Sequence, residues 1–146
     1  MVCLGNICRS PLAEALLKSK VPPSKAYIDS AGLDGWHVGE PPCESSRKIA
    51  KKHGLNIDHL RARKFQIEDF DKFDKIYIMD HLNYDLIKEM ARNQKDMEKV
   101  DFIMNELYPG ENLDVPDSYQ KGEGAAELVY QMLDKATDKI AQKLNQ

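Results

Sequence analysis

The sequence predicts an α/β fold in which a largely parallel sheet is covered by helices on both faces. Short segments rich in β-branched and aromatic residues alternate along the chain with longer segments whose apolar residues recur at helical spacing. Prolines and glycines separate most of these segments, and no internal repeat or linker interrupts them. At 146 residues the chain is expected to form a single domain, residues 1–146.

The first two elements are a strand end and a helix. Met1 and Val2 are expected to finish a strand, and a tight loop follows them. Ser10 is a favoured N-cap and Pro11 a favoured first helical residue, so a helix is predicted from this point. It should end before Pro22, because paired prolines cannot continue a helix.

The next two elements lie on either side of an irregular loop. A strand is predicted at Ala26–Ser30, and the loop that follows is rich in glycine and proline, with Trp36 near its middle. A helix is predicted at Glu44–His53, because apolar residues fall on one side and basic residues on the other. Gly54 is suited to cap the end of this helix.

The remaining half of the chain continues the alternation. The isoleucine- and tyrosine-rich segment Asp74–Met79 predicts a buried strand, and His81–Arg92 predicts the helix after it. Val100–Met104 is a fourth strand candidate. Asn112–Gly124 is expected to form a long loop, and Ala125–Leu144 a long amphipathic closing helix.

Composition excludes several classes of protein. The net charge of −3 offers no basic surface for nucleic acid, and no apolar run is long enough to span a membrane. Three cysteines are an odd and sparse set, which argues against a disulfide framework. The cysteine count and the lack of a leader-like start favour a reducing, cytoplasmic location.

The loop after the first strand has the composition of an anion site. A loop that runs from a strand into a helix can turn its backbone N–H groups inward, at the positive end of the helix dipole. Gly5 is expected to permit a positive φ, and Asn6 tolerates the left-handed region and can brace the loop. The loop consists of Cys3, Leu4, Gly5, Asn6, Ile7, Cys8, Arg9 and Ser10.

Three side chains of this loop suit a nucleophilic reaction on a phosphate. Arg9 offers a planar fork that matches two phosphate oxygens. Cys3 should sit under the bound anion, where the surrounding positive charge favours a nucleophilic sulfur. Ser10 could donate a hydrogen bond to that sulfur and stabilise it as a leaving group.

The segment CLGNICRSP, from Cys3 to Pro11, resembles the phosphate-binding loop of the low-molecular-weight protein tyrosine phosphatases. Asp29–Gly32 and Val115–Asp117 resemble two further segments of that family, and the likeness extends over nearly the whole chain. It implies a three-layer fold with a four-stranded parallel sheet of Rossmann-type topology, the phosphotyrosine phosphatase I-like fold. It also implies hydrolysis of phosphotyrosine proteins or small aryl phosphates, with inorganic phosphate as product.

The resemblance assigns the catalytic roles to three residues. Cys3 would attack phosphorus and become a phosphocysteine, and Arg9 would bind the phosphoryl oxygens. Asp117 would protonate the leaving phenolate and later deprotonate water. The resemblance implies no metal and no cofactor, and the sequence lacks a cluster with metal-ligand spacing.

Further roles follow from the same resemblance. Ser30 and His59 are expected to support the loop through Asn6, although one extra residue separates His59 from the Ala-Arg pair that follows it. Trp36 and Tyr119 are expected to line the substrate cleft. Cys8 is expected to protect an oxidised Cys3 by forming a disulfide with it. No role is predicted for the third cysteine, Cys43.

Some features depart from the family or leave another function open. Asp117 is followed by Ser118 rather than by the usual proline. The first strand is shorter than the family needs, which suggests a longer natural chain. Two alternatives are an arsenate reductase, which would need more cysteines between Asp80 and Lys99, and a silent phosphate-binding domain. A monomer is the default expectation.

Overall fold

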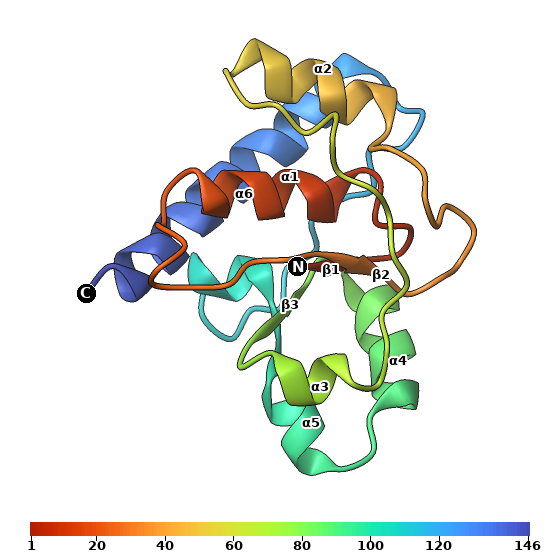
Figure 1. Cartoon of the computed structure of the whole chain (residues 1–146), viewed down its shortest axis with the longest axis vertical. Helices are drawn as coiled ribbons and strands as arrows, with labels where there is room; N and C mark the ends of the chain where they lie inside the picture. Colours follow the sequence, from red (N-terminus) through yellow and green to blue (C-terminus); the bar gives the residue numbers. More distant parts are fainter.

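The computed structural model describes all 146 residues and contains one parallel sheet with the strand order β2-β1-β3-β4 (Figure 1). The strands are β1 (Val2–Cys3), β2 (Ala31–Gly32), β3 (Ile76–Ile78) and β4 (Val100–Phe102). The α-helices are α1 (Arg9–Lys18), α2 (Glu44–Lys52), α3 (Asp69–Lys72), α4 (His81–Met90), α5 (Gln94–Glu98) and α6 (Glu123–Leu144). A 3₁₀ helix, η1 (Ile103–Glu106), follows β4.

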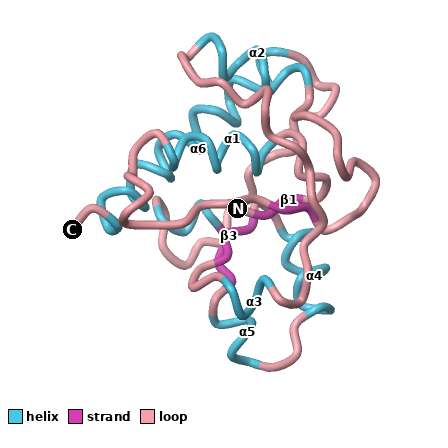
Figure 2. Tube along the Cα trace, viewed as in Figure 1, coloured by secondary structure: helices cyan, strands magenta, loops and turns pink.

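Helices cover the sheet on both faces, as the sequence predicted. Figure 2 shows the short strands between two groups of helices, with α1, α2 and α6 on one side and α3, α4 and α5 on the other. Each group has its own apolar core. A cluster of 21 buried residues lies on the α1 and α6 side, and a cluster of 9 lies on the other side.

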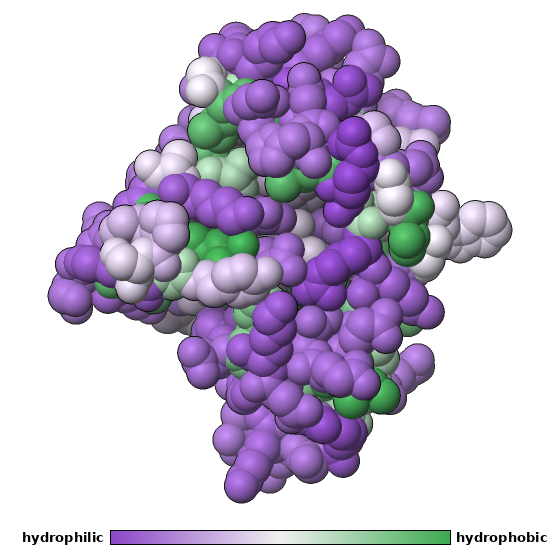
Figure 3. Space-filling model, in the orientation of Figure 1, coloured by the Kyte–Doolittle hydropathy of each residue, from purple (hydrophilic) through white to green (hydrophobic).

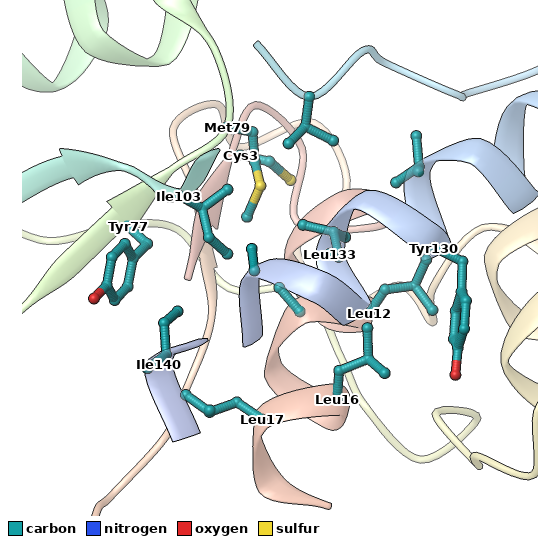
Figure 4. Packing of buried hydrophobic residues seen from close by; sticks show 14 of the residues in the cluster. Cys3, Leu12, Leu16, Leu17, Tyr77, Met79, Ile103, Tyr130, Leu133 and Ile140 are labelled. Carbon is teal, nitrogen blue, oxygen red and sulfur yellow. The ribbon is translucent and has the colours of Figure 1, made fainter. Parts of the chain in front are cut away.

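The larger core is formed mainly by α1 and α6, which pack against each other on the same side of the sheet. Leu12 of α1 and Leu133 of α6 are completely buried, and Figure 4 shows both pointing into the same cluster. Full burial of a side chain of this size stabilises a fold by about 1.5–3 kcal/mol. Cys3 lies in this cluster beside Met79, so apolar packing supports the strand end from which the loop begins.

The central strand places the loop at the carboxyl edge of the sheet. β1 pairs with β2 on one side, with Cys3 opposite Gly32, and with β3 on the other. In parallel sheets ligands bind beyond this edge, because the loops that leave the strands gather there. The end of β3, at Ile78, opens onto the same edge and brings Asp80 close to the loop.

The second strand lies later in the chain than predicted. Ladder pairing occurs at Ala31–Gly32, whereas the predicted segment Ala26–Ser30 is not part of a strand. The pairing reaches only as far as β1 does, and β1 spans Val2–Cys3. The predicted strand ends directly before the residues that pair, so its position in the chain is wrong.

The two short helices α3 and α5 were not predicted, because four or five residues do not establish a helical period. α5 is stabilised at its start by Asn93, whose side chain accepts a hydrogen bond from the Asp96 N–H. None of the helices combines the length and the apolar character that crossing a membrane requires. The face drawn in Figure 3 is mostly hydrophilic, with small separate apolar patches.

Candidate active site

The loop between β1 and α1 turns through one residue in the left-handed region. Asn6 has φ 57°, as the sequence predicted. The positive φ expected at Gly5 is not found. Gly5 provides space instead, because a Cβ atom there would lie 3.0 Å from Cδ2 of His37 and would push that ring away. The glycine therefore lets the loop lie against the neighbouring segment.

β2 lies directly behind this loop. A Cβ atom at Gly32 would lie 2.9 Å from the carbonyl carbon of Gly5 and 3.0 Å from the backbone nitrogen of Asn6. No real side chain tolerates contacts this short with backbone. Gly32 thus allows a strand and the loop to touch through their backbones.

The Cys3 sulfur is buried and receives polar contacts from the loop and from α1. The Ser10 hydroxyl oxygen lies 3.0 Å from the sulfur, and the Asn6 N–H donates to it at 3.3 Å. Cys3 is 2% exposed and is the free cysteine of the chain. Hydrogen-bond donors at these positions stabilise negative charge on sulfur.

A chain of hydrogen bonds leads from Cys3 to a buried carboxylate. Asn6 Nδ2 donates to the hydroxyls of Ser10, at 2.7 Å, and of Ser30, at 2.9 Å. Ser30 in turn donates to Glu14 at 2.5 Å, and the other oxygen of Glu14 pairs with Lys18. An ionised carboxylate only accepts, so Ser30 must donate to it and accept from Asn6. The Ser10 hydroxyl also accepts from Asn6, which leaves its hydrogen for the Cys3 sulfur.

His59 does not support the loop, contrary to the prediction. Its side chain is exposed and makes no hydrogen bond, and the backbone N–H of Arg63 donates to Asn6 Oδ1 instead, at 3.0 Å. The Arg63 guanidinium bonds Asp29 and Asp69. Burial opposes its charge, but the hydrogen bonds that Arg63 donates to Asp69 and the charge of Asp29 raise the pKa of Arg63 above its usual value. The extra residue after His59 is consistent with this exchange of roles.

Arg9 is buried where the β1–α1 loop meets the end of β3 and the loop of residues 112–122, which carries Asp114 and Asp117 and is called the acidic loop below. Its Nη1 lies 2.5 Å from Oδ2 of Asp80 and donates to the carbonyl of Val115 at 2.9 Å. Asp80 is also the N-cap of α4, where its side chain accepts from the Asn83 N–H. The Val115 N–H donates to Met79 at 2.7 Å, which ties the acidic loop to the end of β3.

A pocket of about 80 Å³ opens above the loop. Asp117 lines it together with Cys3 and Arg9, and its carboxylate accepts from the Tyr119 N–H at 3.0 Å. The complete lining is Cys3, Leu4, Gly5, Ile7, Cys8, Arg9, Asp34, His37, Asp117 and Tyr119. No group of three or more His, Cys, Asp or Glu side chains is arranged to hold a metal ion.

The aromatic residues of the pocket differ in part from the prediction. Tyr119 lines it as expected, but Trp36 is 85% exposed and lies outside it. His37 lines the pocket in its place, meets Tyr119 edge-on at 5.9 Å between ring centroids, and bonds Glu40 through Nδ1. Neighbouring residues in an irregular loop point in different directions, and the sequence does not reveal which one points inward.

The cysteines also differ from the prediction. Cys8 forms a disulfide with Cys43, at a Cα–Cα distance of 5.4 Å, rather than remaining free to pair with Cys3. The expectation that Cys43 plays no part is therefore wrong. Pairing across 35 residues depends on how the chain folds, so spacing along the sequence could not predict it.

Two residues at the site were missed by sequence reasoning. Glu14 is an acidic residue on the apolar face of α1, and a charge in that position is itself a signal of a buried partner. Asp80 follows a buried strand at the edge where ligands bind, which is a positional signal.

The whole chain, residues 1–146, matches the family model described as low molecular weight phosphotyrosine protein phosphatase. The low molecular weight protein-tyrosine-phosphatase YfkJ of Bacillus subtilis (strain 168) is 38% identical over 125 residues, 83% of this chain and 80% of that protein. The low molecular weight protein-tyrosine-phosphatase PtpA of Staphylococcus aureus (strain Newman) is 37% identical over 149 residues. This alignment covers 99% of this chain and 94% of PtpA.

Solved structures show the same fold. The crystal structure of YfkJ has a TM-score of 0.89 at 34% identity and covers 99% of this chain and 91% of its own. A protein tyrosine phosphatase from Entamoeba histolytica, with Hepes in its active site, has a TM-score of 0.89 at 33% identity and covers 99% and 94%.

Proposed function

Because the chain belongs to the low molecular weight phosphotyrosine protein phosphatase family, we propose that it hydrolyses phosphotyrosine and other aryl phosphate monoesters through a phosphocysteine intermediate. The observation that carries this proposal is one small pocket lined by Cys3, Arg9 and Asp117. A sulfur nucleophile, a phosphate-binding cation and a carboxyl group are the parts that a metal-independent phosphoryl transfer needs.

In the first step the Cys3 sulfur attacks phosphorus in line with the aryl oxygen. The bond from phosphorus to that oxygen breaks, and Asp117 gives its proton to the leaving group. Arg9 and the backbone N–H groups of the loop stabilise the charge on the three equatorial oxygens. The products of this step are the phenol and a phosphocysteine.

In the second step water attacks the phosphocysteine. Asp117, now ionised, takes a proton from the water, and the bond between sulfur and phosphorus breaks. The Ser10 hydroxyl and the Asn6 N–H are already directed at Cys3, and they stabilise the departing sulfur. Inorganic phosphate leaves, and the enzyme returns to its starting state.

The dimensions of the pocket support an aryl substrate. About 80 Å³ is enough for a phosphoryl group at the bottom but not for a large ligand. The Tyr119 and His37 rings form a wall on which a phenyl ring can pack. Phosphotyrosine side chains of proteins and small aryl phosphates are the substrates that a small pocket with an aromatic wall fits.

Turnover of para-nitrophenyl phosphate and of a phosphotyrosine peptide tests the proposal. We expect Cys3→Ser to lower kcat by about 10⁴-fold or more, since loss of a nucleophile removes the covalent route. Cys43→Ser is the matched control when both variants are assayed with a dithiol present, because it makes the same change outside the catalytic groups. Normal turnover by Cys3→Ser would contradict the mechanism. Arsenate reduction without hydrolysis, or phosphate binding without turnover, would contradict the function.

A further inference from the structure

The Cys8–Cys43 disulfide connects the phosphate-binding loop to the start of α2. Hydrogen bonds that do not involve the sulfurs join the same two segments: the Cys43 N–H donates to the carbonyl of Ile7 at 2.7 Å, and the Ser46 hydroxyl donates to the carbonyl of Cys8 at 3.0 Å. The two cysteines are therefore held opposite each other by backbone contacts as well as by the bond. Such a pair can open and close without rearrangement of its surroundings.

The two sulfurs differ in how a soluble reagent can reach them. Cys8 is 4% exposed, whereas Cys43 is half-buried and lines an open pocket of about 500 Å³. That pocket shares Ile7 and Tyr119 with the catalytic pocket and so lies beside it. A small thiol or disulfide therefore meets Cys43 first.

The surroundings of Cys43 suit a sulfur that carries charge during exchange. Cys43 is the N-cap residue of α2, so its sulfur lies near the positive end of a nine-residue helix. The Ser45 hydroxyl lies 3.5 Å from the sulfur and can donate to it, whereas the Ser46 hydroxyl, 3.2 Å from the sulfur, gives its hydrogen to the Cys8 carbonyl and accepts from the Cys43 thiol. These features favour Cys43 as the attacking thiol and as the one that is released.

We propose that Cys8 and Cys43 form a reversible thiol–disulfide pair that takes up oxidation beside the catalytic pocket and leaves Cys3 as a free thiol. Formation of the pair is independent of what the enzyme does. The expectation that oxidation of the pair preserves phosphatase activity rests on the proposed function.

The exchange balances with a disulfide such as oxidised glutathione as the oxidant. The Cys43 thiolate attacks one sulfur of the oxidant, forms a mixed disulfide and releases one glutathione thiolate. Cys8 then attacks the Cys43 sulfur, which forms the Cys8–Cys43 bond and releases the second glutathione. The protein loses two electrons and two protons, and both are recovered in two molecules of reduced glutathione. A dithiol reverses the sequence by attacking Cys43.

Cys8 can be bonded to one partner at a time, so a Cys8–Cys43 bond and a Cys3–Cys8 bond exclude each other. While Cys43 is present, it competes with Cys3 for Cys8. Without Cys43, an oxidant leaves Cys8 and Cys3 as the remaining pair in the loop, and a bond between them removes the nucleophile. Cys43 therefore decides whether mild oxidation stops turnover.

Oxidation of the reduced protein with oxidised glutathione, followed by alkylation and peptide mapping, tests the pairing. We expect linked Cys8 and Cys43 peptides, an alkylated Cys3, and turnover within about twofold of the reduced enzyme. Under the same treatment Cys43→Ser should form a Cys3–Cys8 link and lose at least about tenfold in turnover, with recovery in a dithiol. Cys43→Ala serves as a second variant should the serine variant fold poorly.

The opposite results overturn the proposal. A Cys3–Cys8 link in the wild type, or no link at all, contradicts the pair, and retained turnover in oxidised Cys43→Ser contradicts its protective role. Cys3→Ser separates the proposal from the catalytic function, because it lacks the nucleophile but should form the Cys8–Cys43 link to the same extent. A wild-type protein that forms this link but hydrolyses no aryl phosphate would contradict the proposed function alone.

Discussion

The guanidinium of Arg9 and the carboxylate of Asp80 form an ion pair with Nη1 2.5 Å from Oδ2, and Arg9 itself is only 3% exposed. The two residues follow adjacent parallel strands at the same edge of the sheet: Arg9 begins α1 after β1, and Asp80 lies between β3 and α4. The pair holds one nitrogen of the guanidinium, and the remaining donors are available to a phosphoryl group. Asp80 thus helps to fix where the Arg9 guanidinium lies beside the pocket.

Loss of this carboxylate charge should weaken phosphate binding. We expect Asp80→Asn to lower kcat/KM for an aryl phosphate about 10- to 100-fold, the effect of a lost hydrogen bond to a charged group. Asparagine is also a good N-cap, so α4 should remain folded. The inhibition constant for inorganic phosphate is the decisive readout. A lower thermal stability with unchanged phosphate inhibition would mean that Asp80 has a structural role only.

Asp117 should matter most when the leaving group is poor. We expect Asp117→Asn to lower kcat about 10²- to 10⁴-fold for a phosphotyrosine peptide, because general acid catalysis is lost. The loss should be smaller for para-nitrophenyl phosphate, whose phenolate leaves without a proton. Asp114→Asn is the matched control, since Asp114 lies in the same loop but bonds His81 at 2.6 Å instead of lining the pocket. Equal losses for both substrates would exclude Asp117 as the acid.

The hydrogen-bond chain from Glu14 to Cys3 should affect turnover more than substrate binding. Ser30→Ala breaks the chain between Glu14 and Asn6, and we expect a fall in kcat of about tenfold with KM nearly unchanged, because the Asn6 amide that orients the Ser10 hydroxyl loses its hydrogen bond on the Ser30 side. Glu14→Gln should also lower the free energy of unfolding, by about 1–3 kcal/mol.

Denaturant unfolding of a control variant shows whether the Glu14 effect is specific. Glu44→Gln makes the same change on the exposed face of α2, where the carboxylate pairs with Lys48. We expect it to leave the unfolding midpoint almost unchanged. An equal shift in Glu14→Gln and Glu44→Gln would show that the buried chain contributes nothing of its own.

The sequence placed both Tyr119 and Trp36 in the substrate cleft, whereas in the structure only Tyr119 lines the pocket, and kinetics can test this difference. Tyr119→Ala should raise KM for an aryl phosphate about two- to tenfold, because a ring contact contributes about 0.5–1.5 kcal/mol. Trp36→Ala should change KM much less, since Trp36 is 85% exposed and lies outside the pocket. Steady-state kinetics with para-nitrophenyl phosphate compares the two variants. A larger effect for Trp36→Ala would show that the tryptophan closes over bound substrate.

Reduction should lower the stability of the wild-type protein. The Cys8–Cys43 bond closes a long loop, and a native disulfide of this kind stabilises a fold by about 2–4 kcal/mol, largely through the unfolded state. We expect the midpoint of denaturant unfolding to fall when a dithiol is added. In Cys43→Ser the midpoint should not respond to the dithiol. A wild-type midpoint that is equally insensitive would show that the bond does not restrain the unfolded chain.

The sequence predicted the elements with a strong local signal. The helix start near Ser10, the helix at Glu44 and the closing helix were all predicted within about two residues, because caps and apolar periodicity are local properties. The loop after β1 was identified for the same reason, since its residue types occur together in one short segment. Asn6 adopts the predicted left-handed conformation.

The errors concern relations between distant segments. The pairing of β2 depends on where β1 lies, the orientation of His37 and Trp36 depends on how their loop packs, and the partner of Cys8 depends on where α2 begins. Each of these is decided by tertiary contacts, which outweigh local preference. The replacement of His59 by Arg63 is an error of the same kind. The donor to Asn6 is a backbone N–H, which almost every residue has, so the type of residue 63 does not predict this contact.

The backbone contact between Gly32 and the β1–α1 loop fixes the shape of this loop before any ligand binds, so the expected anion site is preformed. A preformed site loses little conformational entropy when it binds a ligand, and it recognises the shape and charge of the oxyanion rather than the group attached to it. Any tetrahedral oxyanion of the size of phosphate should therefore occupy it, including the product of the reaction. We expect the enzyme to slow as phosphate accumulates, so that the phosphate level of its surroundings sets its working rate.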